Sequence, residues 1–374
     1  MKKIILSLIL SAPLAASAQI TGDGYYRVKN NASERFITIT DDIVGEVNMS
    51  STTADLSNIT TWRGFDYVKS NPASVIYIEA VGNKYNLKGQ GTSIYDISGG
   101  RVYIDIKSKN KDNNNPYYFS ITYSGAEFRL YDNSTKKDKG GVDQTGDVKY
   151  SYWNILPITD DDYNYLGLQP TVKAGDDWYG TIYASYPFKV ASEGVTLYYV
   201  DGVKDGEFQL KEITSEVKPA STPMVFKCSS DDPANNKIIP VADITTAPTD
   251  NLMGGTLFAS SIRKHIKRVE FDATTMRVLG KNSDGDLIFT TAKPEQLTDN
   301  SYIPMNTAWL NVPSGLTGDF KLVSRDNFTG IRNIDAQKSN TDNAIYTLTG
   351  VRQNNKNSLR KGIYISNGKK IVIR

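Results

Sequence analysis

The sequence predicts an all-β fold in which a β-trefoil-like barrel, a β-sandwich and a small C-terminal β module follow one another. Apolar and polar residues alternate with a period of two through much of the chain, which is typical of half-buried strands. The 23 tyrosines outnumber the 12 phenylalanines and four tryptophans together. Tyrosine favours strands that have one buried and one wet face.

The first eighteen residues predict a secretory signal peptide. Lys2 and Lys3 precede an apolar run over residues 4–10, and a small-x-small site at 16–18 places the cleavage between Ala18 and Gln19. The run is shorter than the roughly 20 apolar residues that span a bilayer, and an N-terminal strand or anchor helix is the alternative. We expect an exported chain without a transmembrane span.

Three strand pairs over residues 22–158 predict a threefold barrel. They are 25–29 with 35–39, 75–78 with 84–87, and 117–121 with 127–131, and turn residues join the partners of each pair. Tyr26 precedes Tyr77 by 51 residues, and Tyr77 precedes Tyr118 by 41 residues. Similar β units at about forty-residue spacing indicate a repeat architecture, here a β-trefoil-like barrel.

The opening Gly-Tyr-Tyr-Arg-Val-Lys-Asn at 24–30 and the closing Tyr-Trp-Asn-Ile-Leu-Pro at 152–157 resemble strands of ricin-like β-trefoils. The resemblance implies the barrel and, through it, glycan binding. However, the Gln-x-Trp signature of sugar-binding members is missing, because neither Trp62 nor Trp153 follows a glutamine at that spacing.

Residues 159–176 predict a linker between the barrel and a second β domain. The linker opens with Asp160-Asp161-Asp162 and contains Pro170. A solvated connector is the interpretation that we prefer for the acidic triplet, and a cation site is the alternative.

Residues 177–331 predict a β-sandwich. A Pro-Ala-Ser-Thr-Pro segment at 219–223 precedes an apolar strand, and further strand patterns continue to residue 310. Over roughly 177–324 this order resembles a β-sandwich module of surface proteins from gut and oral Gram-negative bacteria, and no activity follows from that resemblance. Residues 257–268 are an exception, because their apolar spacing predicts a helix with a basic face.

A polar linker over 332–343 and a β module over 344–374 complete the predicted organisation. The module contains Ile-Tyr-Thr-Leu-Thr-Gly, then Lys-Gly-Ile-Tyr-Ile, then a basic-apolar strand after Asn367-Gly368, a strong hairpin signal. This order resembles the C-terminal sorting domain of type IX secretion cargo. The residues that carry the resemblance are Gly350, Lys361, Gly362, Ile363, Tyr364, Ile365, Lys369 and Lys370.

The resemblance implies recognition by the secretion machinery and passage to the outer-membrane surface or the medium. A small β module that merely completes the fold is the alternative. A short basic β module would also be accessible to anionic lipid.

Charge is distributed unevenly along the chain. The net charge is +2, but residues 352–374 hold seven basic residues and no acid, and two more lysines lie in the first eighteen residues. Subtracting these nine positive charges leaves residues 19–351 at −7. An acidic body argues against nucleic-acid binding, which needs a basic surface.

No recognisable catalytic set, metal site or cofactor motif emerges from the sequence. The single histidine, His265, lies among lysines and arginines that oppose its protonation, and the single cysteine, Cys228, follows an apolar run and is expected to be buried and inert. Residues 282–286 contain three calcium-type ligands, but a hairpin turn is the preferred interpretation. Because glycosidases need only two carboxylates, the 41 acidic residues leave a hydrolase open.

Three functions are therefore compared. The leading hypothesis is a non-catalytic binding protein that recognises a glycan or a host or matrix protein. The alternatives are a structural or adhesive surface component, and a glycoside hydrolase or peptidase. Tyr152, Trp153 and Trp178 are the candidate contact residues, and core packing is the alternative for each, since aromatic side chains dominate cores.

Overall fold

The computed structural model describes residues 23–40, 45–49, 53–56, 60–93, 95–97, 100–101, 103–110, 115–123, 126–132, 140–143, 148–204, 207–258, 267–324, 345–347, 352–353, 362–366 and 369–373. The chain divides into two compact units, Met1–Arg325 and Asp326–Arg374. The described residues are predominantly β, as the sequence predicts. The predicted signal peptide at 1–18 and the predicted linker at 332–343 lie outside the described residues.

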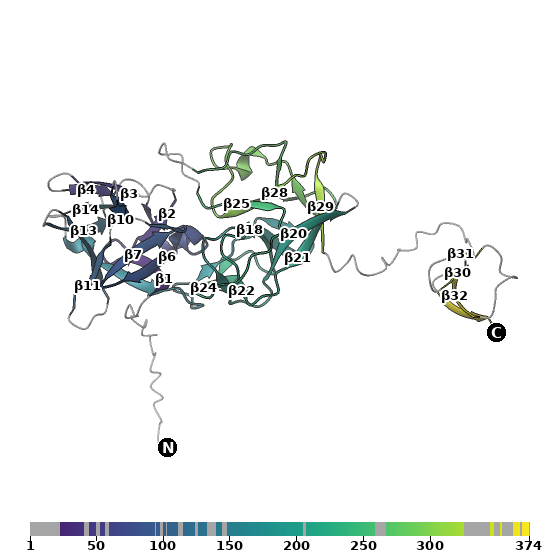
Figure 1. Cartoon of the computed structure of the whole chain (residues 1–374), viewed down its shortest axis with the longest axis horizontal. Helices are drawn as coiled ribbons and strands as arrows, with labels where there is room; N and C mark the ends of the chain where they lie inside the picture. Colours follow the sequence, from purple (N-terminus) through teal and green to yellow (C-terminus); the bar gives the residue numbers. More distant parts are fainter. Residues whose placement is uncertain are drawn as a thin grey trace, which may run out of the picture. The chain divides into compact units, whose positions relative to one another are not determined.

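The N-terminal half of the first unit forms a large sheet that curls around an apolar core (Figure 1). Its strands are β1 (Gly24–Asn30), β2 (Phe36–Ile39), β3 (Gly45–Met49), β4 (Thr53–Leu56), β5 (Thr60–Arg63), β6 (Ile76–Val81), β7 (Lys84–Gly89), β8 (Thr92–Ser93), β9 (Tyr95–Ile97), β10 (Gly100–Arg101), β11 (Asp105–Ser108), β12 (Tyr117–Tyr123), β13 (Ala126–Asp132), β14 (Gly140–Asp143) and β15 (Trp153–Pro157). Short helical turns interrupt them: α1 (Phe65–Val68), η1 (Pro72–Ser74) and η2 (Val148–Ser151).

All three predicted strand pairs form. β6 pairs with β7 and β12 pairs with β13, and both pairs are antiparallel over several consecutive residues. The first pair is shorter, because β1 pairs with β2 only at Lys29–Phe36. On the same edge the start of β1 pairs with β6, and on the other edge β1 pairs with β15. The pairing of β1 with β15 brings the two ends of this region together. Trp62 and Trp153 lie at its centre with ring centroids 5.2 Å apart.

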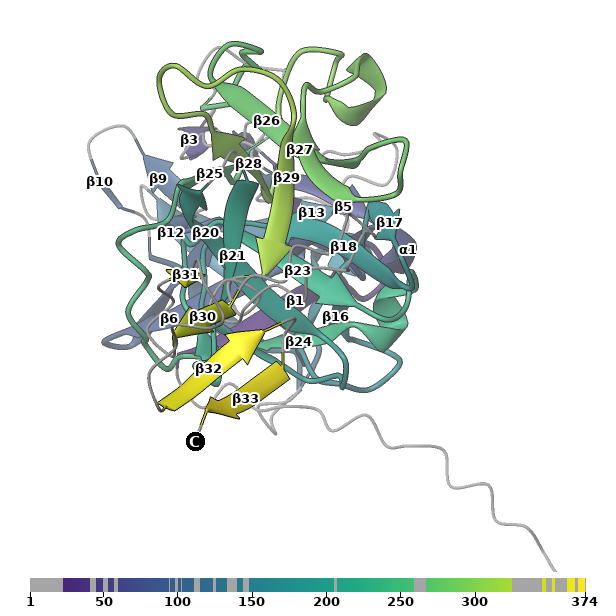
Figure 2. The same cartoon turned by 90° about the vertical axis from the view of Figure 1, so that its right-hand side faces the viewer.

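The C-terminal half of the first unit contains two sheets (Figure 2). The smaller one is built from β16 (Leu166–Gly167), β19 (Phe188–Val190), β22 (Val217–Lys218) and β24 (Lys237–Pro240). The larger one contains β17 (Val172–Ala174), β18 (Asp177–Ile182), β20 (Thr196–Lys204), β21 (Glu207–Glu212), β23 (Met224–Cys228), β25 (Met253–Thr256), β26 (Met276–Lys281), β27 (Leu287–Thr290), β28 (Thr307–Asn311) and β29 (Phe320–Ser324). The 3₁₀ turns η3 (Pro233–Asn235) and η4 (Pro294–Gln296) complete this half.

Residues 159–176 are not the solvated linker that the sequence predicts. They contain β16 and β17, and Tyr165, Leu166 and Leu168 are buried. β16 pairs with β24, while β17 forms a hairpin with β18. Turn-forming aspartates and a proline suggest a linker in the sequence, but the apolar residues between them pack into the core of the second half.

A buried arginine joins the two halves of this unit. Arg27 on β1 is fully buried, and its guanidinium donates to Ser74, to the Asn164 side chain, to the Tyr165 carbonyl at 2.6 Å and to the Val68 carbonyl at 2.6 Å. All four acceptors are neutral. Burial lowers the pKa of Arg27 to about 10, so the group keeps its charge at neutral pH.

The predicted helix at 257–268 is not supported by the described residues. Residues 259–266, with His265, lie outside them, and the flanking positions 257–258 and 267–268 are not helical. Within the described part of the chain, no helix has the length and apolar character needed to cross a membrane.

The second unit contains one small antiparallel sheet. Its strands are β30 (Ile345–Thr347), β31 (Arg352–Gln353), β32 (Gly362–Ser366) and β33 (Lys369–Ile373). β32 and β33 pair from Ser366–Lys369 onward, which confirms the hairpin predicted at Asn367-Gly368. β30 pairs antiparallel with β31 at Tyr346–Arg352 and with β32 on its other side.

Candidate functional site

A cleft of about 500 Å³ lies between the two halves of the first unit. Strands β1, β6 and β7 contribute one wall, and the segments before β19 and after β24 contribute the other. The lining residues are Tyr25, Val75, Tyr77, Glu79, Lys88, Gln90, Gly91, Ser185, Tyr186, Pro187, Ala220, Ala242, Ile244 and Thr245. We call this cavity the tyrosine cleft.

Three tyrosines form the aromatic part of the tyrosine cleft. Tyr25 pairs with Tyr77 in the register of β1 and β6, which brings their ring centroids within 4.8 Å. Tyr186 comes from the other wall, with its ring centroid 5.5 Å from that of Tyr25. Tyr25 and Tyr77 remain partly exposed, whereas Tyr186 is buried. Tyr25 and Tyr77 therefore provide the accessible aromatic surface of the cleft, and the buried Tyr186 ring packs behind Tyr25 from the other half.

The phenol groups of these tyrosines stay neutral at ordinary pH. Burial and, secondarily, the neighbouring Asp23 carboxylate raise the pKa of Tyr77 to about 12. Burial raises the pKa of Tyr186 further still. The Tyr186 hydroxyl is buried and has no hydrogen-bond partner among the described residues, an arrangement that costs about 1–3 kcal/mol for a polar group removed from water.

An ion pair lies beside the aromatic rings. Lys88 Nζ is 2.8 Å from a Glu79 carboxylate oxygen, and the Asn86 amide donates to the other oxygen at 2.9 Å. Tyr77 and Lys88 are paired across β6 and β7, so the ammonium lies 5.8 Å from the Tyr77 ring centroid. These contacts fix one acceptor and one donor beside the rings, with no net charge between them.

A reciprocal amide pair holds one end of the tyrosine cleft. Gln90 Nε2 donates to Asn306 Oδ1 at 2.8 Å, and Asn306 Nδ2 donates back to Gln90 Oε1 at 3.1 Å. Gln90 also donates to the Leu257 carbonyl at 2.7 Å. Both residues adopt left-handed backbone, with φ of 50° and 56°. Such conformations are strained outside glycine and concentrate at functional sites.

A second cavity of about 600 Å³ lies on the Asn306 side of this amide pair. Its lining includes Tyr67 and Asn71 from the N-terminal half and Leu168, Phe226 and Met305 from the other half. Its lining includes Asp66 but no lysine or arginine, so it has no counterpart to the Glu79–Lys88 ion pair of the tyrosine cleft. We therefore regard the tyrosine cleft as the better candidate site.

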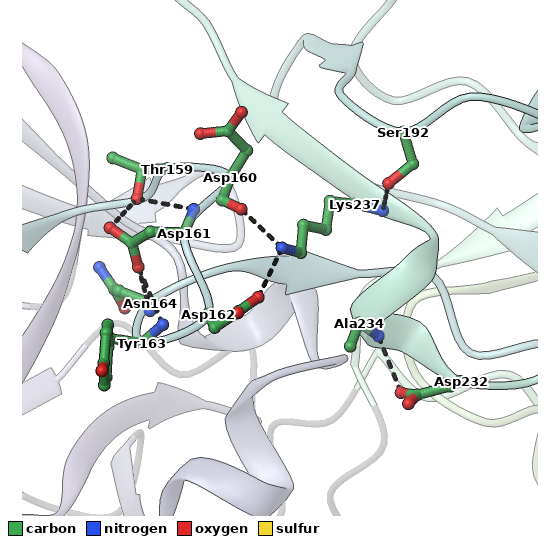
Figure 3. Close-up of polar contacts among 10 residues, drawn as sticks. All are labelled: Thr159, Asp160, Asp161, Asp162, Tyr163, Asn164, Ser192, Asp232, Ala234 and Lys237. Atoms are coloured by element: carbon green, nitrogen blue, oxygen red, sulfur yellow. Dashed lines mark hydrogen bonds and ion pairs between the residues drawn. The ribbon is translucent and has the colours of Figure 1, made fainter.

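Asp161 caps the turn that precedes β16, and its carboxylate does not face an open cation site. Its carboxylate accepts from the Thr159 hydroxyl at 2.5 Å and from the Tyr163 and Asn164 amides at 2.9 Å each (Figure 3). Desolvation raises the pKa of Asp161, but these hydrogen bonds outweigh it and hold the pKa below its usual value. The carboxylate is therefore ionised and committed to the turn.

Lys237 on β24 supplies the positive charge beside the rest of the acidic triplet. Its ammonium donates to the Asp160 carbonyl at 2.6 Å and lies 2.9 Å from the Asp162 carboxylate (Figure 3). Across the described residues, histidine, cysteine and carboxylate side chains form no group of three that could hold a metal ion. The contacts therefore give the acidic triplet a structural role. The triplet belongs to the folded unit and not to a linker.

The three predicted contact residues are not brought together. Trp153 is fully buried, and its indole donates to the Leu130 carbonyl at 3.1 Å, so it packs the core and is withdrawn as a contact residue. Tyr152 is partly exposed, with Lys109 4.7 Å from its ring. Trp178 lies on β18, partly buried against the second core, with Lys173 5.4 Å from its ring.

The predicted turn over residues 282–286 is confirmed. β26 and β27 pair up to Lys281–Leu287, and Asn282 accepts from the amides of Asp284 and Asp286.

Cys228 is buried, as predicted, and burial raises the pKa of its thiol to about 11. Neither Cys228 nor the turn over residues 282–286 lines the tyrosine cleft.

The proposed export residues are described only in part. Gly362, Ile363, Tyr364 and Ile365 lie on β32, and Lys369 and Lys370 begin β33. Ala18, Gln19, Gly350 and Lys361 lie outside the described residues.

No protein-family model, curated protein or solved structure matches the chain.

The tyrosine cleft was missed in the sequence because its walls are distant in the chain. Tyr25 and Tyr77 belong to predicted strands, but Tyr186 lies more than a hundred residues further on. The repeat spacing relates Tyr77 to Tyr26 rather than to Tyr25, so it does not indicate the contact between Tyr25 and Tyr77.

Proposed function

We propose that this chain is an exported, non-catalytic carbohydrate-binding protein, and that the tyrosine cleft holds a neutral saccharide. The observation that carries the proposal is the cluster of the Tyr25, Tyr77 and Tyr186 rings beside the Glu79–Lys88 ion pair. Mostly apolar lining with a few fixed polar groups is the usual composition of small-molecule sites.

The chemistry of a sugar matches both parts of this lining. A pyranose ring has an apolar C–H face, which packs against aromatic rings, and hydroxyl groups at its edge, which need donors and acceptors. Glu79 accepts and Lys88 donates, and each is already fixed by a partner.

The balance of charge favours a neutral ligand over an acidic one. Glu79 and Lys88 neutralise each other at 2.8 Å, so an anionic group would gain attraction from Lys88 and meet repulsion from Glu79. A neutral hydroxyl forms charge-assisted hydrogen bonds with both groups without that repulsion.

We also propose the finer architecture and the route of export that the sequence predicts. The pairing of β1 with β15 and the repeated strand pairs support a trefoil-like barrel over 22–158. The two sheets of the second half, packed on a common core around Leu197 and Phe226, support a sandwich. The signal peptide and the resemblance of 344–374 to a sorting domain support delivery to the outer surface or the medium.

A glycan array tests the proposed function. The mature chain is applied to neutral oligosaccharides alongside the double variant Tyr25→Ala/Tyr77→Ala, and each lost ring is expected to weaken binding about tenfold. Tyr163→Ala is the control, because that ring is 76% exposed and lies outside the cleft. Absence of binding to every neutral glycan, or equal binding by the double variant, contradicts the proposal.

A further inference from the structure

A second aromatic surface lies on the outer face of β11, β12 and β13. Lys107 and Tyr118 are directly opposite each other in the register of β11 and β12. Tyr117 and Phe119, which alternate with Tyr118 along β12, point to the other face and are buried in the core. The strand period of two therefore separates a packed inner face from an outer face rich in tyrosine and cations. We call this outer face the basic face.

Positively charged side chains cover the aromatic rings of the basic face. The Arg129 guanidinium lies 4.2 Å from the Tyr118 ring centroid, and Lys107 lies 5.8 Å from the same ring. Tyr152 meets Tyr118 edge to face with centroids 6.4 Å apart and carries Lys109 at 4.7 Å. Cation–π contact and edge-to-face packing hold these side chains in place before any ligand arrives.

Two carboxylates lie near the cations of this face: Glu127, and Asp105, which pairs with Lys84 and also acts on Lys107. Glu127 lies 3.1 Å from Lys107 and 3.1 Å from Arg129. Desolvation raises the pKa of Glu127, but the hydrogen bonds from Lys107 and Arg129 outweigh it and keep the carboxyl ionised. Lys84, Lys107, Lys109 and Arg129 against Glu127 and Asp105 leave a local charge of +2 (four minus two), on a body whose overall charge is negative.

Arg129 retains donors for an outside partner. Glu127 accepts from its Nε atom, and within the described part of the chain its two terminal nitrogens donate to no other group. A guanidinium that is oriented by a ring and by one carboxylate offers its remaining fork to a second carboxylate in bidentate geometry.

We infer that the basic face binds an acidic polysaccharide of the uronate class, with its carboxylates on Arg129, Lys107 and Lys109 and its sugar rings against Tyr118 and Tyr152. This site is separate from the tyrosine cleft and goes beyond the proposed function. A uronate chain fits better than a nucleic acid, whose phosphates follow one another about every 3.4 Å along each strand and demand a larger basic surface. The acidic remainder of the body repels both polyanions, and it repels the more densely charged nucleic acid more strongly.

The test is a fluorescence-anisotropy titration of the full mature chain. The probes are a fluorescein-labelled oligogalacturonate, a neutral maltooligosaccharide of the same length, and a single-stranded DNA oligonucleotide of the same charge. The oligogalacturonate is expected to bind, and to bind more weakly as salt is added, because exposed charges are screened.

Two variants with matched controls locate the site. Lys107→Gln and Arg129→Gln are each expected to weaken oligogalacturonate binding about tenfold, the usual effect of losing a charged hydrogen bond. Lys321→Gln is the control, because Lys321 and Lys107 are equally exposed at 45% and each pairs with one part-exposed acid at about 3 Å. Tyr77→Ala controls for the tyrosine cleft, and neither control is expected to change binding.

A third variant is expected to act in the opposite direction. Glu127→Gln removes the negative charge that competes with the ligand and should tighten oligogalacturonate binding, which a misfolded protein would not do. Unchanged binding by both Lys107→Gln and Arg129→Gln overturns the inference, as does tighter binding of the DNA than of the oligogalacturonate. Equal binding of the maltooligosaccharide with the same response to these variants also overturns it, since charge would then play no part.

Discussion

The guanidinium of Arg27 donates to the carbonyl of Tyr165 at 2.6 Å across 138 residues of sequence. This bond, with those to Val68, Ser74 and Asn164, connects β1 to the segment that opens the second half. Because that segment is packed rather than flexible, the two halves form a single unit and the tyrosine cleft between them has fixed walls.

Replacing Arg27 with methionine is expected to destabilise the whole first unit. The substitution keeps an apolar chain of similar length but removes every donor, and it leaves buried acceptors without partners at a cost of about 1–3 kcal/mol each. We expect the free energy of unfolding, measured by urea denaturation, to fall by about 3 kcal/mol or more. Lys69→Met, a nearby surface change, should leave the urea midpoint unchanged, and an equal midpoint for Arg27→Met would contradict the role given to Arg27.

Asp161→Ala is expected to lower stability at neutral pH by about 1 kcal/mol, a usual cost for losing a side-chain cap. The folded-state pKa of Asp161 is depressed, so its contribution is complete above the unfolded value near 3.8 and disappears as the pH falls through the lower folded pKa. Urea midpoints of wild type and variant should therefore converge in acid. Asp160→Ala is the matched control, because the contact at that position uses the backbone carbonyl. A difference in urea midpoint between wild type and Asp161→Ala that persists at low pH would contradict the stabilising role of the ionised carboxylate.

The thiol of Cys228 should react with a disulfide reagent only when the protein unfolds. Burial raises its pKa to about 11, so both access and the thiolate fraction are low at mildly alkaline pH. We expect labelling to follow the urea unfolding curve. Rapid labelling of the native protein would show that the second core is open at this position.

Export predicts a defined N-terminus for the mature protein. Cleavage after Ala18 should give a chain that begins at Gln19, detectable by mass spectrometry of protein recovered from medium, cell surface and periplasm. Removal of the C-terminal unit would appear as a second loss of mass in the surface and medium fractions. Protein that retains residues 1–18 in every fraction would argue for an anchor or a structural N-terminal segment.

The sequence predicts local structure well and the site poorly, for physical reasons. Alternation and turn residues are local, so the strand pairs at 75–87 and 117–131 could be read directly. Whether Leu166 and Leu168 lie in a linker or a core depends on partners far along the chain, as does the approach of Tyr186 to Tyr25. Trp153 illustrates the same limit, since an aromatic residue on a strand can face either the core or the solvent, and here it faces the core.

The most direct test of the central claim is a calorimetric titration of the best neutral glycan from the array into wild type, Tyr77→Ala and Tyr118→Ala. The proposed function predicts that Tyr77→Ala loses about tenfold or more in affinity, while Tyr118→Ala, altered on the basic face, binds as wild type does. Full affinity in Tyr77→Ala, or a loss confined to Tyr118→Ala, would contradict the assignment of the tyrosine cleft as the carbohydrate site.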